Sequence, residues 1–443
     1  MMQRAFSKFV GNCLLFLAGF LFAALTSSEA LEIGLGTADI TPDVTTFRVP
    51  LAGYGARLGR PATGIHDPLR AKVLYLNDKN RHMALIAVDL RSSTPEFKKQ
   101  IVEKTADLGM NLDNIFVAAS HTHAGPSMYP EKFWQMQFGK YDPAIVDIMT
   151  SAIAQAIRRA AAATIPARVG YAAKNLDGFT RNRRWRYNTE QRNANGETPN
   201  VEPKLSVVRF DDMNGECLAL AVHFAAHPTI LGAENMRISA EWPGVLQREL
   251  ERAFPKCVAL YLNGAEGDQS PAVGEGGDEF ERMNNYGMRL AQYAAQLAEQ
   301  IETRPDLSIG YMRCLPDLPE ITFPESARRK FAAYADAARE ALPGKAELQL
   351  FQIGPIALAG LPGEPIMEVG QAVEEGFADS DFELPLAIGL ANDYIGYIVN
   401  EKEYAHGGYE VESRSYYGSG LGAFIETEIA LMGKKLAGKA TCD

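Results

Sequence analysis

Short apolar runs alternate with longer segments of helical periodicity along most of the chain. The apolar runs predict β-strands at residues 73–77, 83–90, 114–120, 167–173, 205–210, 218–225, 257–262, 346–352 and 356–361. Apolar positions at helical spacing predict helices at residues 96–107, 144–162, 245–253, 278–301, 326–341, 366–377 and 423–436. Strands that alternate with helices are typical of α/β proteins. We therefore expect an α/β fold with a mixed β-sheet core flanked by helices.

The predicted elements follow one another without a long linker rich in Pro, Ser or Gly, and without a repeat of roughly 20–50 residues. This continuity indicates one large catalytic domain over residues 31–443. The most irregular segment, residues 177–203, is polar and rich in Arg and Asn. It is interpreted as a long loop, and long loops in compact domains are often functional.

Residues 1–30 are predicted to be a secretory signal peptide. Arg4 and Lys8 precede an apolar stretch at residues 9–25, and small residues flank a cleavage position before Leu31. A single membrane anchor is the alternative, but the apolar run is shorter than the roughly 20 residues that a spanning helix needs. We expect a secreted or periplasmic protein. Its cysteines would form one or two disulfides or remain buried thiols, and the sequence does not pair them: Cys217, Cys257, Cys314 and Cys442.

Charge and composition exclude some partners. The chain has 44 Lys and Arg against 55 Asp and Glu, a net charge of −11, and 47% apolar residues. The apolar content argues against disorder. The acidic balance argues against nucleic acid as a partner, because binding to phosphates depends on Lys and Arg. Any membrane contact is expected to be peripheral. Residues 133–138 are interpreted either as an apolar lip or as a turn of a buried helix, and no basic amphipathic helix is evident.

Four polar segments each follow the end of an apolar run. They are residues 120–126, 227–229, 361–365 and 392–397. Functional sites of open α/β sheets gather in loops beyond the carboxyl ends of strands. If the strands are neighbours, the four segments converge.

Three residues of these segments suggest a metal site. His121 and His123 are two positions apart, so on an extended chain they point the same way, and one could bind metal while the other faces substrate. His121, His227 and Glu364 would form a His/His/carboxylate set, a pattern of catalytic zinc sites. Zinc lowers the pKa of bound water to roughly 7. A His-x-His pair alone is as often explained by packing or hydrogen bonding.

Two further features have open interpretations. Ser270 lies in Gly267-Asp268-Gln269-Ser270-Pro271, which is not the Gly-x-Ser-x-Gly nucleophile elbow, so it is either a nucleophile of another kind or a serine in a turn. Arginines cluster in the irregular segment, either on a solvated loop or as a clamp for an anion or a carbonyl: Arg181, Arg183, Arg184 and Arg186.

Together these segments resemble the neutral (non-lysosomal) ceramidase family, and specifically its N-terminal catalytic domain. The matching pieces occur in family order over about residues 31–420. They are Ile33-Gly34, Thr37-Ala38-Asp39-Ile40-Thr41-Pro42, Gly53-Tyr54-Gly55, Thr63-Gly64-Ile65-His66-Asp67, His121-Thr122-His123, Asn182-Arg183, His227-Pro228, Gly267-Asp268-Gln269-Ser270-Pro271, Pro362-Gly363-Glu364, Asn392-Asp393-Tyr394-Ile395-Gly396-Tyr397, Tyr404 and Tyr409-Glu410.

The resemblance implies a role for each matching residue. The positions of the zinc ligands are those of His121, His227, Glu364 and Tyr397, with one ion per chain. His123 matches the histidine that hydrogen-bonds substrate, and Arg183 matches an arginine near the polar head of the substrate. Tyr409 matches a tyrosine proposed to stabilise the oxyanion, and Ser270 occupies the position of the family serine. The implied reaction is hydrolysis of the amide of N-acylsphingosine by zinc-activated water.

The sequence departs from the family in three places. The family's C-terminal immunoglobulin-like domain has no expected counterpart after the predicted helix at 423–436. Glu266 stands in the segment Ala265-Glu266-Gly267-Asp268, where it places a carboxylate near Ser270, and residues 181–186 are more basic than the family pattern. These departures leave another amide, ester or lactone as alternative substrates. A metal-dependent phosphoesterase and a non-catalytic binding module are further alternatives; the complete set of ligand-type residues argues against the second.

Overall fold

The computed structural model describes residues 31–198, 200–305, 307–325 and 335–438. The predicted signal peptide, Cys442 and most of the predicted helix at 326–341 lie outside the described residues. Among the helices that are described, none combines the length and the apolar character needed to cross a membrane.

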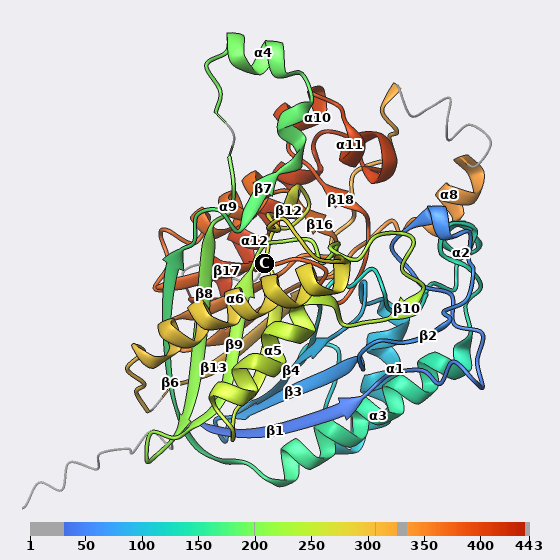
Figure 1. The fold of residues 1–443 in the computed structure, drawn as a ribbon. Helices are drawn as coiled ribbons and strands as arrows, with labels where there is room; N and C mark the ends of the chain where they lie inside the picture. The colour runs from blue at the N-terminus through green and yellow to red at the C-terminus, as the bar shows by residue number, and fades with distance from the viewer. Residues whose placement is uncertain (1–30, 199, 306, 326–334, 439–443) are drawn as a thin grey trace, which may run out of the picture.

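The larger of two mixed sheets has eight strands in the order β11-β9-β8-β6-β1-β3-β4-β5 (Figure 1). Neighbours are parallel at β11–β9 and β4–β5 and antiparallel elsewhere. Only two residue pairs join β1 to β6, so the sheet consists of two four-stranded halves. Its strands are β1 (Glu32–Asp39), β3 (Arg70–Asn77), β4 (His82–Val88), β5 (Ile115–Ala119), β6 (Ile165–Asn175), β8 (Lys204–Asp212), β9 (Cys217–Phe224) and β11 (Val258–Asn263).

The smaller sheet has four strands in the order β13-β14-β15-β17, and only β15 and β17 are parallel neighbours. Its strands are β13 (Ile309–Cys314), β14 (Leu348–Ile353), β15 (Ile356–Gly360) and β17 (Leu384–Ile388). Short strands pair around the loops: β2 (Gly64–Ile65) with β10 (Arg237–Ile238), β7 (Thr180–Asn182) with β12 (Gln269–Pro271), and β16 (Glu364–Pro365) with β18 (Tyr397–Ile398).

Helices cover the outer faces of both sheets. Those packed on the eight-stranded sheet are α1 (Pro95–Thr105), α3 (Pro143–Ala162), α5 (Glu241–Ala253) and α6 (Glu279–Glu299), and those on the four-stranded sheet are α9 (Met367–Glu375) and α12 (Leu421–Leu436). The shorter helices are α2 (Lys132–Phe138), α4 (Thr189–Ala194), α8 (Ala335–Ala341), α10 (Glu401–Ala405), α11 (Tyr409–Arg414), η1 (Gly55–Arg57), η2 (Ala106–Leu108) and η3 (Arg183–Arg186).

Alternation along each strand explains this layering. In β3, Leu74 and Leu76 pack toward the smaller sheet, whereas Val73 and Tyr75 belong to the core under the helices. The two sheets meet through side chains such as Phe116 and Phe351, whose ring centroids are 5.2 Å apart. Because both faces of the central strands are buried, they read in the sequence as continuous apolar runs.

The predicted fold class is confirmed: the core is a mixed β-sheet structure flanked by helices in a single domain. Each strand predicted from an apolar run is present, but the sequence does not predict β1, β13 and β17 or any of the six short strands β2, β7, β10, β12, β16 and β18. The prediction of a long loop at residues 177–203 is partly wrong, because β7, η3 and α4 form there. Short polar elements of this kind lack the periodicity that reveals longer ones.

The structure resolves the open interpretation of residues 133–138, whereas that of the cysteines stays a prediction, because Cys442 lies outside the described residues. Phe133, Trp134 and Phe138 are buried in α2, so this segment is a buried helix rather than an apolar lip. Cys217 and Cys257 are buried free thiols in the structure, at the adjacent starts of β9 and β11.

Close contact between β1 and α3 depends on glycine. A Cβ placed on Gly36 would lie 2.3 Å from the carbonyl oxygen of Ala156. We expect Gly36→Ala to force β1 and α3 apart and to lower the free energy of unfolding by about 1–3 kcal/mol, the usual cost of overpacking. Urea unfolding would measure the change. Gly64→Ala is the matched control, because nothing lies within 4 Å of its Cβ position. If the two variants unfolded at the same urea concentration, the packing argument would be wrong.

Candidate functional site

The loops after β5, β9 and β15 meet at one end of the two sheets. Asn263, the last residue of β11, donates a hydrogen bond to the carbonyl oxygen of Ser120 (3.4 Å). Ala118 and Ala391 form an isolated bridge that connects the first sheet to the loop after β17. The predicted convergence of the four polar segments is confirmed, because Glu364 lies 3.2 Å from both His121 and His227 and is paired with Tyr397.

Two histidines and one carboxylate form the centre of the site. Nε2 of His121 and Nε2 of His227 each lie 3.2 Å from Oε2 of Glu364, and all three side chains are buried. The opposite ring nitrogens are fixed by the backbone: Nδ1 of His121 donates to the carbonyl of Arg91, and Nδ1 of His227 to that of Glu266, both at 2.7 Å. A histidine held in this way presents an unprotonated Nε2, which is the form that binds metal.

Protonation states support this arrangement. Burial lowers the pKa of His121, and it lowers the pKa of His227 to about 3, so both rings are neutral at pH 7. Burial alone would raise the pKa of Glu364, but His121 and His227 together with Arg91 hold it well below its ordinary value. Oε1 of Glu364 accepts hydrogen bonds from Arg91 (3.1 Å) and from the hydroxyl of Tyr394 (2.6 Å). Only Oε2 is left to face the imidazoles.

Glu266 adds a second carboxylate to the cluster. It is fully buried, and neither of its carboxylate oxygens has a hydrogen-bond partner in the described part of the chain. One ligand atom from each of His121, His227, Glu266 and Glu364 can be chosen so that all lie within 4.8 Å of one another. Burial and the nearby charge of Glu364 raise the pKa of Glu266 well above its ordinary value.

This donor set fits a divalent metal ion. Two nitrogen lone pairs facing a carboxylate oxygen at 3.2 Å repel one another unless a cation or a proton lies between them. The unpartnered oxygens of Glu266 would likewise be compensated by a positive charge. Imidazole and carboxylate are ligands of zinc and of several other divalent ions, so the donor set does not identify the metal.

His123 lies between the cluster and the pocket. Its Nε2 is 3.2 Å from Nε2 of His121, and its Nδ1 has no hydrogen-bond partner among the described residues. The ring packs edge-on against Tyr54, with centroids 4.7 Å apart. A Cβ on Gly53 would lie 2.4 Å from the same ring, and Gly53 has a φ of 97°, so only glycine fits there.

Tyr397 and Arg183 form the opposite wall. Tyr397 is paired with Glu364 across β16 and β18, and its hydroxyl accepts a hydrogen bond from Arg183 (3.0 Å). Arg183 also donates to Glu410 (2.7 Å) and to the carbonyl of Gly267 (2.7 Å). The predicted metal ligand Tyr397 is thus held in place by the predicted site residue Arg183.

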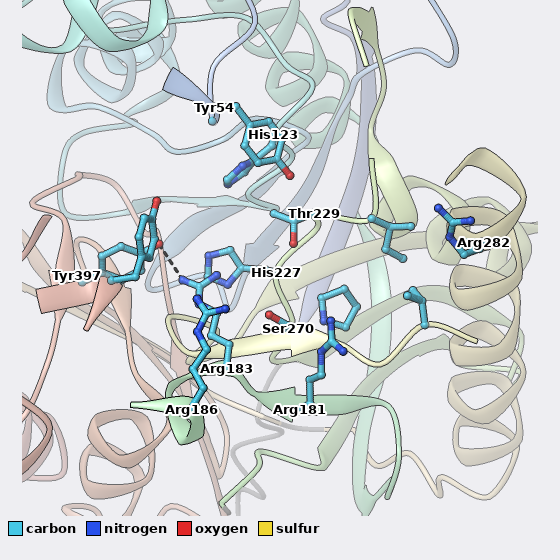
Figure 2. Close-up of a pocket in the computed structure, with 15 residues that line it drawn as sticks. Tyr54, His123, Arg181, Arg183, Arg186, His227, Thr229, Ser270, Arg282 and Tyr397 are labelled. Carbon is cyan, nitrogen blue, oxygen red and sulfur yellow. Dashed lines mark hydrogen bonds between the residues drawn. The ribbon is translucent and has the colours of Figure 1, made fainter. Parts of the chain in front are cut away.

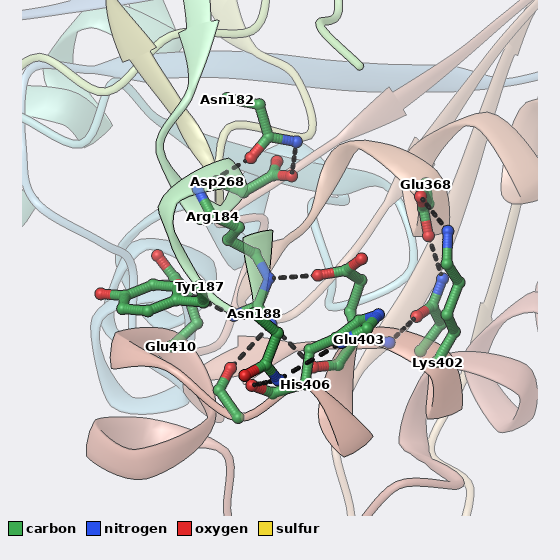
Figure 3. Close-up of polar contacts among 12 residues, drawn as sticks. Asn182, Arg184, Tyr187, Asn188, Asp268, Glu368, Lys402, Glu403, His406 and Glu410 are labelled. Carbon is green, nitrogen blue, oxygen red and sulfur yellow. Dashed lines mark hydrogen bonds and ion pairs between the residues drawn. The ribbon is translucent and has the colours of Figure 1, made fainter. Parts of the chain in front are cut away.

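A buried ionic network fixes the segment that carries Arg183 (Figure 3). Arg184 donates to Glu403 (2.8 Å) and to Glu410 (2.7 Å). Arg192 also donates to Glu403 (2.6 Å). Asn182 donates to Asp268 (2.8 Å), which ties the segment to the strand that holds Ser270. Residues 182–192 are therefore anchored to α10, α11 and β12.

A pocket of about 470 Å³ opens beside the cluster (Figure 2). Among its lining residues are the predicted site residues His123, Arg183, His227, Ser270, Tyr397 and Tyr409. Tyr409 is 45% exposed and stacks edge-on against Tyr397. His121 and Glu364 are fully buried behind this surface.

Ser270 lines the pocket in β12 but lacks the surroundings of a nucleophile. Among the described residues, no histidine or carboxylate forms a hydrogen bond with its hydroxyl. A serine nucleophile is activated by an adjacent base. The arrangement therefore favours metal-assisted attack over a serine mechanism.

Sequence reasoning did not assign roles to Arg91 and Tyr394, which hold Glu364, or to Glu410, which holds Arg183. Arg91 directly follows the predicted strand at 83–90, and a charged residue at the end of a buried strand is a usable signal. Glu364 and Glu410 lie more than 200 positions from Arg91 and Arg183, so no local sequence pattern indicates these pairs.

The chain is similar to known proteins in sequence and in fold. A family model described as "Neutral/alkaline non-lysosomal ceramidase, N-terminal" matches residues 31–284. The neutral ceramidase of Mycobacterium tuberculosis is 24% identical over an alignment covering 90% of this chain and 76% of the relative. The neutral ceramidase of Pseudomonas aeruginosa is 22% identical over 94% of this chain and 73% of the relative.

Solved structures of similar fold agree with these matches. The crystal structure of neutral ceramidase from Pseudomonas aeruginosa superposes with a TM-score of 0.79 and 21% identity, over 94% of this chain and 75% of the other. A structure of a ceramidase complexed with C2 gives a TM-score of 0.78 and 20% identity, over 94% and 77% of the two chains. At this identity the likeness concerns the fold.

Proposed function

The chain belongs to the neutral/alkaline non-lysosomal ceramidase family, and from this premise we propose that it hydrolyses the amide bond of N-acylsphingosines with one bound zinc ion. The cluster of His121, His227 and Glu364 carries the proposal, because both Nε2 atoms face one carboxylate oxygen at 3.2 Å. The names of the relatives and the ceramidase complexed with C2 support an amide of this type as the substrate.

His121, His227, Glu364 and Tyr397 would hold the ion, with the carboxylate of Glu266 close by. When bound, zinc supplies a Lewis acid for the scissile carbonyl and lowers the pKa of water to roughly 7. Arg91 and Tyr394 keep Glu364 ionised and oriented, and backbone carbonyls keep both imidazoles in the metal-binding tautomer.

The remaining residues act on the substrate. His123, with an unpartnered Nδ1 beside the pocket, would donate a hydrogen bond to the carbonyl oxygen as it gains negative charge. Tyr409 would provide a second donor from the exposed side of the pocket. Arg183 would position Tyr397, and Ser270 would contact the substrate rather than attack it.

Export to the periplasm or the cell exterior is part of the proposal. It is supported by the charged start, the apolar stretch and the small residues before Leu31. N-terminal sequencing of the purified protein would test cleavage at that position.

The function is tested by release of dodecanoic acid from N-dodecanoylsphingosine, measured by mass spectrometry alongside elemental analysis of bound metal. We expect turnover by the protein as purified, loss of turnover after exhaustive chelation, and recovery on adding zinc. A protein that binds metal at this cluster but leaves the amide intact would contradict the ceramide assignment. Parallel assays with an ester, a lactone and a phosphomonoester would then distinguish the alternative reactions.

A further inference from the structure

The pocket beside the cluster is unusually basic for a protein of net charge −11. Its lining includes Arg181, Arg183, Arg186 and Arg282 and contains no Asp or Glu. Figure 2 draws Arg181, Arg183 and Arg186 entering from the side of β7 and η3, with Arg282 of α6 apart from them. A concave surface lined with one sign of charge concentrates ligands of the opposite sign.

Among the residues that the structure describes, only one of these four arginines forms an ion pair with a carboxylate. Arg183 is paired with Glu410 at 2.7 Å. Within the described part of the chain, Arg181, Arg186 and Arg282 form no ion pair with a carboxylate. Arg186 donates to the hydroxyl of Tyr187 (2.9 Å) and Arg282 to the carbonyl of Gly277 (2.7 Å), so both keep further donors free.

Three carboxylates close to these segments form no ion pair with Arg181, Arg186 or Arg282 in the described structure. Asp268 accepts hydrogen bonds from Asn182 and Gln269. Glu279 accepts from the backbone of Gly232. Glu275 shares a smaller neighbouring cavity with Arg282 without pairing with it.

The backbone beneath the free arginines is preorganised. Arg181 is paired with Ser270 in the β7–β12 ladder, and Arg186 ends η3, which the buried partners of Arg184 hold. Guanidinium groups match the geometry of carboxylates and phosphates, to which they donate paired hydrogen bonds. N-acylsphingosine carries no ionised group and would leave these donors unused.

We propose that the pocket selects N-acyl amides whose amine portion bears an oxyanion, either a carboxylate or a phosphate, bound by Arg181, Arg186 and Arg282. The acyl chain has no such group, so the anion belongs to the part that leaves as amine. Water adds to the carbonyl carbon, the C–N bond breaks, and the products are a fatty carboxylate and an amine that keeps its oxyanion. This inference rests on the proposed function for its chemistry, whereas the anion preference is tested by binding alone.

The test uses two pairs of ligands that differ in charge. N-dodecanoylserine is compared with N-dodecanoylserinol, in which a hydroxymethyl group replaces the carboxylate. N-dodecanoyl-O-phosphoethanolamine is compared with N-dodecanoylethanolamine. Calorimetry on the metal-loaded protein, below micelle-forming concentrations, gives the Kd of each. We expect the anionic member of at least one pair to bind about tenfold more tightly, as charge-assisted hydrogen bonds permit, and to lose that advantage at high salt.

Substitutions of single arginines test whether these side chains cause the preference for anionic ligands. For each pair, the preference is the Kd of the uncharged ligand divided by the Kd of the anionic ligand. Arg181→Gln and Arg186→Gln should each reduce this ratio severalfold, and Arg181→Lys should keep part of it. Arg252→Gln is the matched control, because Arg252 is an exposed arginine of α5 that pairs with Glu249. The Kd ratio of the Arg252→Gln variant should equal that of the wild-type protein.

The outcomes separate this inference from the function on which it rests. Equal binding within both pairs, or a preference that survives the double variant Arg181→Gln/Arg186→Gln, would overturn it. A preference that depends on the arginines, without amide cleavage, would support the anion site and count against the proposed function. Release of inorganic phosphate from the phosphorylated amide, with the amide intact, would overturn the assignment to amides and favour a phosphoesterase.

Discussion

His121→Ala is expected to remove bound metal and amide hydrolysis together. His121 contributes one of the two Nε2 atoms that face Glu364, and its ring is fixed from behind by the carbonyl of Arg91. Loss of a group that merely orients a ligand typically costs about 10–100-fold in metal affinity, so loss of a ligand should cost more. Elemental analysis of the purified variant and the dodecanoate-release assay measure the two effects.

Two further variants make this result interpretable. His121 has a φ of 73°, a left-handed conformation that alanine tolerates poorly and asparagine better. His121→Asn therefore tests the imidazole with less strain on the backbone. His82→Ala removes a histidine of β4 whose ring hydrogen-bonds to the carbonyl of Gly109 and stacks on Tyr75, and it should keep both metal and activity. Full metal content in a folded His121→Asn protein would show that His121 is not a ligand.

His123→Ala is expected to keep the metal and to lose about 10²–10³ in kcat, the usual effect of removing one donor to a developing oxyanion. His123 lines the pocket, whereas His121 and Glu364 are buried behind it. Its removal should therefore affect the rate more than KM. Single-turnover kinetics with the metal-loaded variant would measure the chemical step directly.

The same experiment tests a second arrangement of ligands. Nε2 of His123 lies 3.2 Å from that of His121, and ligand atoms of His121, His123 and His227 also fall within 4.8 Å of one another. If His123→Ala loses metal as completely as His121→Ala does, His123 is itself a ligand. If it keeps full activity, His123 has no part in the chemical step.

Most of the fold could be predicted because the central strands are buried on both faces. β4, β5 and β9 are mostly apolar in sequence. The bounds of the neighbouring elements can be predicted from their length and from the turn residues that flank them. β1 escaped prediction because Gly34 and Gly36 lower its strand propensity, yet these glycines are what allow α3 to approach. β17 escaped because Pro385 interrupts it, and prolines argue against a strand.

The site was only partly predictable, for a different reason. His121, His227 and Glu364 stand in polar segments that follow predicted apolar runs, so the sequence itself makes them candidate ligands. Tyr397 is a candidate only through the resemblance to the family. The residues that support these four could not be predicted, because the contact between Arg91 and Glu364 spans 273 positions and that between Arg183 and Glu410 spans 227. Arg181, Arg186 and Arg282 lack a carboxylate partner within the described part of the chain, and this property has no local signature because it depends on carboxylates from distant segments.

The cluster draws its residues from both sheets. His121 and His227 follow strands of the eight-stranded sheet, while Glu364 follows β15 of the smaller one. An ion held by all three would join the two layers, so its binding and the docking of the sheets would be thermodynamically linked. A metal at about 100 times its Kd stabilises the folded state by roughly 2.7 kcal/mol. Metal supply would then set the lifetime of the protein as well as its activity, because scarcity would leave it inactive and easier to unfold and degrade.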